Sequence, residues 1–160
     1  MTLDPARTDV NTQDDGLVNE DDGLVNEGDE WYQKLLRRAK SDHKADTVQL
    51  LIRHGADVTA RDDTHSTSLH LASSKWSVET VELLIQHGAD VNAQNGNQST
   101  PLHLAASSHL AVEGNIVRLL LKHGANIDAK DSEGRTPLQI ASSVGHYWIA
   151  KLLSDCHARR

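Results

Sequence analysis

After about residue 30, apolar side chains recur along the chain at helical spacing. In the segment SVETVELLIQH, Val78, Val81, Leu84 and Ile85 lie three or four residues apart and predict an amphipathic helix. The helix is expected to end at Gly88, because glycine readily adopts the left-handed conformation of a helix C-terminus. The polar stretch that follows, ADVNAQNGNQS, is rich in Asp, Asn and Gly and predicts a turn-rich loop or hairpin.

A second kind of segment alternates with the first and begins with a threonine. It reads TSLHLASS from Thr67, TPLHLAAS from Thr100 and TPLQIASS from Thr136. Threonine is a good helix N-cap, and proline is tolerated directly after it because the first helical position needs no N–H. A leucine and an alanine three residues apart then share one face, and the small alanine lets neighbouring helices approach. Each segment therefore predicts a short helix.

The two kinds of segment share one period. Gly55, Gly88 and Gly124 are spaced by 33 and 36 residues, and the three threonines have the same spacings. The distance from each glycine to the next threonine is always 12 residues, so three additional residues lie between Thr100 and Gly124. The chain is predicted to repeat a helix, a short turn, a second helix and an extended loop.

The segments TPLHLAA and HGADVNA resemble the ankyrin-repeat family, since six or more positions recur in register. The resemblance extends over about residues 29–157. It implies an all-α fold, a solenoid of four helix-turn-helix units joined by hairpin loops that project roughly perpendicular to the helices. We place the units at residues 31–62, 63–95, 96–131 and 132–160.

The first and last units differ from the others in the way expected of caps, which keep the inward face of a repeat and make the outward face polar. In the first unit, KLLRRAK replaces TPLHLAA. Leu36 and Ala39 keep the inward positions, whereas Arg38 stands where other units have an apolar residue. In the last unit, His157 replaces the helix-ending glycine, and no hairpin is expected after it.

The additional residues of the third unit lie in the segment SSHLAVEGNIV. Its Leu, Ala and Val are fair to good helix formers, whereas Gly114 and Asn115 signal a turn. We expect the first helix of this unit to run about one turn longer, to Glu113. Leu110 or Val112 would then form a protruding apolar edge, and a loose surface loop is the alternative.

The first 30 residues have a different character. The heptapeptide DDGLVNE occurs twice in residues 14–27, but its apolar residues are adjacent and form no helical seam, so a coiled coil is not predicted. Residues 1–30 hold ten acidic side chains and one basic side chain, a net charge of −9, whereas residues 31–160 have a net charge of +2. High charge with few apolar residues predicts a disordered tail, which either keeps the protein soluble or presents a linear motif in two copies.

The composition excludes some kinds of site and indicates where in the cell the protein acts. Cys156 is the single cysteine, which excludes an intrachain disulfide and a zinc site built on several cysteines. The sequence shows no apolar run long enough to span a membrane and no apolar N-terminal stretch typical of secretion, so a cytoplasmic or nuclear location is expected. Nucleic-acid binding is not expected, because the body lacks a dense stripe of Lys and Arg.

The ten histidines do not predict a metal site. Five recur at repeat spacing, which places them about one repeat apart and too far for one ion: His54, His70, His87, His103 and His123. The family resemblance implies that the histidine of TPLH hydrogen-bonds to neighbouring units. Four more histidines lie off these ladders, with no cysteine placed to help any pair: His43, His65, His109 and His146.

The sequence offers no recognisable catalytic motif. Ser107 and His109 are close in sequence at a helix end, which is not the geometry of a nucleophile and its base, and neither a G-x-S-x-G elbow nor a Gly-rich phosphate loop occurs. We expect a monomer without enzymatic activity, cofactor or small-molecule substrate. An enzyme is the least favoured alternative.

The resemblance implies binding of a partner protein on the concave surface formed by the hairpin tips and the first helices. An inhibitor of a partner enzyme, acting through the same surface, is the alternative. Trp76 is either buried against the second helix or an exposed anchor, in which case Trp76→Ala would weaken binding by about 2 kcal/mol. The residues implied at this surface are Asp63, Thr64, Ser66, Lys75, Trp76, Asn97, Ser99, Ser108, His109, Leu110, Glu133, Arg135 and Val144.

The segment LIQHGADVN fits the pattern L-x5-[DE]-V-N that asparaginyl hydroxylases recognise in ankyrin hairpins. The resemblance points to Asn92 as a candidate hydroxylation site. The alternative is that Asn92 only stabilises the turn.

Overall fold

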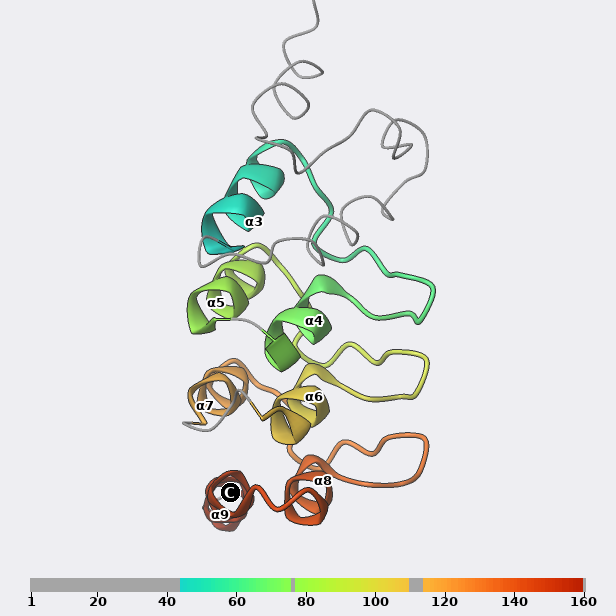
Figure 1. Ribbon diagram of the computed structural model, residues 1–160, viewed down its shortest axis with the longest axis vertical. Coiled ribbons are helices and arrows are strands. Elements are labelled where there is room, and N and C mark those ends of the chain that lie inside the picture. Colours follow the sequence, from blue (N-terminus) through green and yellow to red (C-terminus); the bar gives the residue numbers. More distant parts are fainter. Residues whose placement is uncertain (1–43, 76, 110–113, 160) are drawn as a thin grey trace, which may run out of the picture.

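The computed structural model describes residues 44–75, 77–109 and 114–159, which form a stack of helices (Figure 1). Within these ranges, α3 (Lys44–Arg53) precedes three helix pairs. The backbone of the same ranges forms no strand beyond an isolated bridge between Arg61 and Thr67. The predicted all-α repeat fold is confirmed. The pairs are α4 (Ser68–Lys75) with α5 (Val78–Gln86), α6 (Pro101–Ser107) with α7 (Asn115–Lys122), and α8 (Pro137–Ser143) with α9 (Tyr147–Ala158).

The helices stand in two columns (Figure 1). We call α4, α6 and α8 the inner helices and α3, α5, α7 and α9 the outer helices. The inner helices contact one another in order, α4 with α6 and α6 with α8. The loops that lead into the inner helices all project from the same side of the stack. This arrangement aligns equivalent residues of successive units in rows.

The inner helices begin at the predicted threonines. At α8, the N–H of Thr136 donates to the side-chain Oε1 of Gln139 at 2.9 Å, and the N–H of Gln139 donates to Oγ1 of Thr136 at 3.3 Å. Pro137 occupies the first helical position. The reciprocal bonds satisfy N–H groups that have no partner inside the helix.

The outer helices α3, α5 and α7 end at the glycines that mark the period. The φ angle is +85° at Gly55, +92° at Gly88 and +87° at Gly124, in the left-handed region where a side chain is strained. After Gly88, the N–H of Ala89 donates to the carbonyl of Leu84 at 3.0 Å, which satisfies a carbonyl of the last turn. The predicted helix ends are confirmed.

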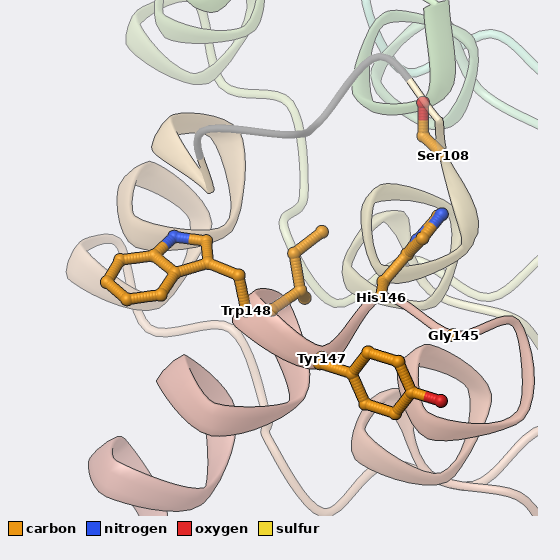
Figure 2. Close-up of a pocket in the computed structure, with 6 residues that line it drawn as sticks. Ser108, Gly145, His146, Tyr147 and Trp148 are labelled. Carbon is orange, nitrogen blue, oxygen red and sulfur yellow. The ribbon is translucent and has the colours of Figure 1, made fainter.

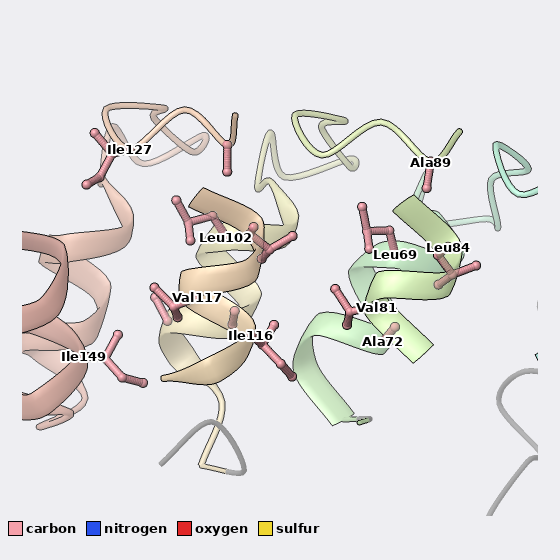
Figure 3. Packing of buried hydrophobic residues seen from close by; sticks show 14 of the residues in the cluster. Leu69, Ala72, Val81, Leu84, Ala89, Leu102, Ile116, Val117, Ile127 and Ile149 are labelled. Carbon is pink, nitrogen blue, oxygen red and sulfur yellow. The ribbon is translucent and has the colours of Figure 1, made fainter. Parts of the chain in front are cut away.

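The core lies between the two columns and is aliphatic (Figure 3). Leu69, Leu84 and Leu102 are fully buried, and burial of such a side chain contributes about 1.5–3 kcal/mol. Ala72 of α4 and Ala105 of α6 are also fully buried. Because alanine is small, it lets these inner helices pack closely, as the sequence predicted.

The expected extension of the first helix in the third unit is wrong. α6 ends at Ser107, and Ser108 has an extended backbone with φ −77° and ψ 126°. The Ser108 hydroxyl donates to the carbonyl of Ser74 at 2.6 Å, which holds this segment against the preceding unit instead of continuing the helix. Gly114 precedes α7 with φ +65° and lies in the turn, as expected. Residues 110–113, and with them the expected apolar edge, lie outside the described residues.

Several other predictions also fall outside the described residues. They concern the acidic tail and the expected first helix of the first unit, both in residues 1–43, and Trp76. In the last unit, α9 continues through His157 to Ala158. In the part of the chain that the structure describes, each helix is too short or too polar to cross a membrane.

Candidate partner-binding surface

Each hairpin loop before an inner helix is held by one polar side chain. In the loop before α4, Oδ1 of Asp62 accepts hydrogen bonds from the N–H groups of Thr64 and Ser66, both at 2.9 Å. Asn95 and Asp131 make the equivalent pairs of bonds in the next two loops. Because these backbone groups are satisfied inside the loop, the tips keep their shape without a partner.

Neighbouring hairpins are joined to one another. The N–H of Gly96 donates to the carbonyl of Thr64, and the N–H of Ser132 donates to the carbonyl of Asn97, both at 2.9 Å. These bonds align the three tips in a row (Figure 1). The exposed tip residues that the sequence predicted form what we call the hairpin-tip surface. They are Asp63, Thr64, Asn97, Glu133 and Arg135.

The charge of Arg135 is already paired within its own tip. Its Nε lies 3.0 Å and its Nη2 lies 2.9 Å from Oδ2 of Asp131, and Nη2 lies 3.0 Å from Oε1 of Glu133. Burial raises the pKa of Asp131, but hydrogen bonds from the Arg135 backbone and guanidinium and from the Glu133 N–H outweigh it and hold that pKa below its usual value. Arg135 therefore shapes the tip more than it offers a free charge.

Two of the residues expected at the surface do not lie on it. Ser66 is 6% exposed and Ser99 is 9% exposed. Ser66 Oγ accepts a bond from the Asn95 side chain at 3.4 Å, and the carbonyl of Ser99 lies 2.9 Å from Nε2 of His70. Both serines connect neighbouring units from inside, because the hairpin folds their side of the loop toward the inner helices.

A second row of predicted residues lies at the C-terminal ends of the inner helices. Lys75 is the exposed last residue of α4, and Ser108 and His109 follow α6. Val144 follows α8 and is 43% exposed. Ser108 is half-buried, whereas His109 is exposed. The neighbouring candidate Leu110 lies outside the described residues.

Two large aromatic residues extend this row, and sequence reasoning missed them. Tyr147 is 80% exposed and Trp148 is 53% exposed at the start of α9. With Val144 and Leu50, they are the large apolar side chains that stand most open to solvent among the described residues. We call Lys75, Ser108, His109, Val144, Tyr147 and Trp148 the helix-end surface.

A cavity of about 310 Å³ opens in the helix-end surface (Figure 2). Ser108 lines it from the end of α6, and Gly145, His146, Tyr147, Trp148 and Ile149 line it from the turn and first residues of α9. The cavity is large enough to receive a side chain of a partner but is at the lower end of the size of small-molecule sites.

The signal for the aromatic pair was present in the periodicity of α9. Ile149 and Leu153 are buried four residues apart and define the inward face. Tyr147 and Trp148 precede this pair and lie off its stripe. The indole of Trp148 lies close to Gly114 at the start of α7, since a Cβ added to Gly114 would be 3.6 Å from its Nε1.

Comparison with known protein families agrees with this geometry. A family model described as "Ankyrin repeats (3 copies)" matches residues 17–95, 35–131 and 94–159. The chain belongs to the ankyrin-repeat family. Among curated proteins, no sequence gives a significant match to this chain.

Two histidines of this ankyrin-repeat protein connect its units. His70 and His103 are buried, and their Nε2 atoms lie 2.9 Å from the carbonyl of Ser99 and 3.0 Å from the carbonyl of Arg135. Since a carbonyl only accepts, each Nε2 carries the hydrogen. Burial lowers the pKa of both imidazoles, which favours the neutral ring. Their implied structural role is confirmed.

The candidate hydroxylation site is part of another inter-unit contact. The side-chain Nδ2 of Asn92 donates to the carbonyl of Gly124 at 3.1 Å, and its Oδ1 accepts from the N–H of Asn126 at 2.7 Å. Asn92 is exposed. Both ends of its amide are used in the folded ankyrin stack, which supports the structural role; hydroxylation stays a prediction.

Proposed function

We propose that this ankyrin-repeat protein binds a partner protein through the helix-end surface, with the hairpin-tip surface as a polar flank. Ankyrin repeats generally serve as protein–protein interaction modules. The free thiol of Cys156 suits a reducing compartment, so we propose the cytoplasm or nucleus as the place of binding.

The observation that carries the proposal is the exposure of Tyr147 and Trp148 beside an open cavity. Tyrosine and tryptophan are the residue types most enriched among those that dominate binding free energy. A large aromatic side chain buries about 150–250 Å² when it becomes covered. Tyr147 is 80% and Trp148 is 53% exposed, so at about 25 cal/mol per Å² the uncovered part of each ring contributes about 3 kcal/mol before ordering costs.

The hairpin-tip surface complements this apolar centre. Its residues are small or charged, and the loops that carry them are already ordered by bonds such as those from Asp62 to Thr64. A polar rim around an apolar centre is the usual anatomy of a protein interface. Because the tips are pre-organised, little conformational entropy is lost when they meet a partner.

The proposal is tested by capture of the partner with the full chain, followed by affinity measurement with purified components. The double variant Tyr147→Ala/Trp148→Ala should raise the dissociation constant at least about 30-fold, which corresponds to about 2 kcal/mol of binding free energy. Both side chains are exposed, so circular dichroism should show unchanged helicity.

Lys122→Ala is the matched control, since Lys122 is exposed at the end of an outer helix and belongs to neither surface. It should leave the affinity unchanged. Equal binding by the wild type and the aromatic double variant would overturn the assignment of the surface. Removal of residues 1–30 in the same assay separates simple partner binding from inhibition that depends on the acidic tail.

A further inference from the structure

Two histidines that the sequence separates meet at the edge of the cavity. His109 follows α6 and His146 precedes α9, 37 residues later. Nδ1 of His109 lies 3.2 Å from Nε2 of His146, and the ring centroids are 5.1 Å apart with planes at 82°. Neither histidine recurs at the spacing of the repeat, so the sequence gave no sign that the two side chains are in contact.

The hydrogen bond made by Nδ1 of His146 determines which of its two ring nitrogens carries the hydrogen. Its Nδ1 lies 3.0 Å from the carbonyl of Ala106. Since the carbonyl accepts only, Nδ1 of His146 is the donor, and in the neutral ring Nε2 has a lone pair directed at His109. Metal-binding histidines typically donate their second N–H to a carbonyl or carboxylate in this way, which orients the ring.

The separation of the two nitrogens fits a shared ion. Imidazole nitrogens bind Zn²⁺ at about 2.0–2.1 Å, so two of them at a tetrahedral angle lie about 3.3 Å apart. The observed 3.2 Å is close to that value. Without an ion, the same two atoms are placed for a direct hydrogen bond from Nδ1–H of His109 to Nε2 of His146.

We propose that His109 and His146 form a two-histidine site for a divalent transition-metal ion. Imidazole ligands select the zinc, copper and nickel class over magnesium and calcium, which prefer oxygen. His109 is exposed and His146 is only half-buried, so water can reach the pair and fill the remaining coordination positions. In the described ranges no three side chains of His, Cys, Asp or Glu gather at one point, so two ligands come from the described residues.

A bound ion would tie the end of α6 to the start of α9. Because it binds the folded arrangement and not the unfolded chain, it would raise the thermal stability of the last two units. The inference goes beyond the proposed partner binding and does not depend on it.

The test is calorimetric titration of the full chain with Zn²⁺, and separately with Ni²⁺, using two single variants. His146→Asn keeps a donor at the position of Nδ1 for the Ala106 carbonyl but removes the Nε2 ligand. His109→Gln removes the Nδ1 ligand from an exposed residue. Each variant should weaken the site about 10- to 100-fold. His123→Gln is the matched control, because His123 is exposed and caps the C-terminal end of α7.

Thermal unfolding provides a second readout. Wild type and His123→Gln should gain melting temperature with Zn²⁺ and lose the gain with chelator, whereas the variant that combines His109→Gln with His146→Asn should not respond. Mg²⁺ should not distinguish these proteins. Equal Zn²⁺ affinity in the wild type and the two single variants, or no Zn²⁺ binding by the wild type, would overturn the proposal and leave a direct hydrogen bond between the rings.

Discussion

The inner helices α4 and α6 differ from α8 in the side chain that closes their first turn. In α6, Nδ1 of His103 lies 3.1 Å from the N–H nitrogen of Thr100 and 2.9 Å from its Oγ1. In α8, Oε1 of Gln139 lies 2.9 Å from the N–H nitrogen of Thr136. Histidine and glutamine thus cap the helix in the same manner.

The two residue types differ in what lies beyond the cap. His103 continues through Nε2 to the carbonyl of Arg135 in the next hairpin, and His70 makes the equivalent bond one unit earlier. Gln139 stands in the last helix pair, where the described chain has no further hairpin to reach. In the three described helix pairs this sequence position therefore has a capping role, and in the first two of them it also has a connecting role.

The largest expected loss of stability comes from a substitution that removes both the capping and the connecting hydrogen bonds of one histidine. His70→Ala removes the cap and leaves the carbonyl of Ser99 buried without this donor, so the free energy of unfolding should fall by about 3 kcal/mol. Urea denaturation measures the change. His123→Ala, at an exposed position, should change it by less than about 0.5 kcal/mol, and a similar small loss for His70→Ala would contradict the account.

A smaller effect separates the connecting role from the cap. His103→Asn keeps an oxygen near the position of Nδ1, so the cap remains, but the shorter side chain does not reach the carbonyl of Arg135. We expect a loss of about 1.5 kcal/mol from that carbonyl. Gln139→Glu keeps the capping oxygen at a position where the described residues form no connecting bond, and its loss should stay below about 0.5 kcal/mol. Equal losses in the same denaturation series would contradict the division of roles.

The smallest of these effects concerns the hairpin tips, which also differ between the middle and last units. His65 and Gln98 have φ of +58° and +55°, and the equivalent position in the last hairpin is Gly134 with φ of +73°. The middle units therefore hold strained side chains where the last unit has a glycine. Gly134→Ala should destabilise the protein by about 1 kcal/mol, and Gln98→Gly should stabilise it by a similar or smaller amount. Thermal unfolding at constant pH checks both signs.

The sequence predicted those parts of the fold that repeat. The period gave the helix starts at Thr100 and Thr136 and the helix end at Gly88, because capping depends on residues a few positions apart. The period did not predict where α6 ends, because the hydrogen bond from Ser108 to Ser74 joins residues 34 apart in the sequence.

The candidate surface was predicted less completely. Asp63 and Glu133 are exposed in the hairpin tips, and their part in binding stays a prediction, whereas Ser66 is buried because the loop folds back. The exposure of Tyr147 and Trp148 was not predicted, because these residues occur in one unit and have no equivalents in the others with which to compare them. The contact of His109 with His146 arises from stacking and has no sequence period.

The protonation state of His70 and His103 tests their connecting role directly. Burial, the largest cause, lowers the pKa of His70 and His103 below the ordinary value, while the hydrogen bonds from their Nε2 atoms to Ser99 and Arg135 oppose that shift. The neutral ring is the form that stabilises the fold. Its contribution is complete above about pH 6.5, the unfolded value, and is lost as the pH falls through the lower folded pKa.

The decisive measurement is a pH titration of the imidazole nitrogens by ¹H–¹⁵N NMR, with assignments from His70→Asn and His103→Asn. We predict that both rings stay neutral with the hydrogen on Nε2 below pH 6.5, the ordinary histidine value. Two rings with the hydrogen on Nδ1, or rings that are protonated at or above pH 6.5, would contradict the claim that these histidines bind each unit to the next.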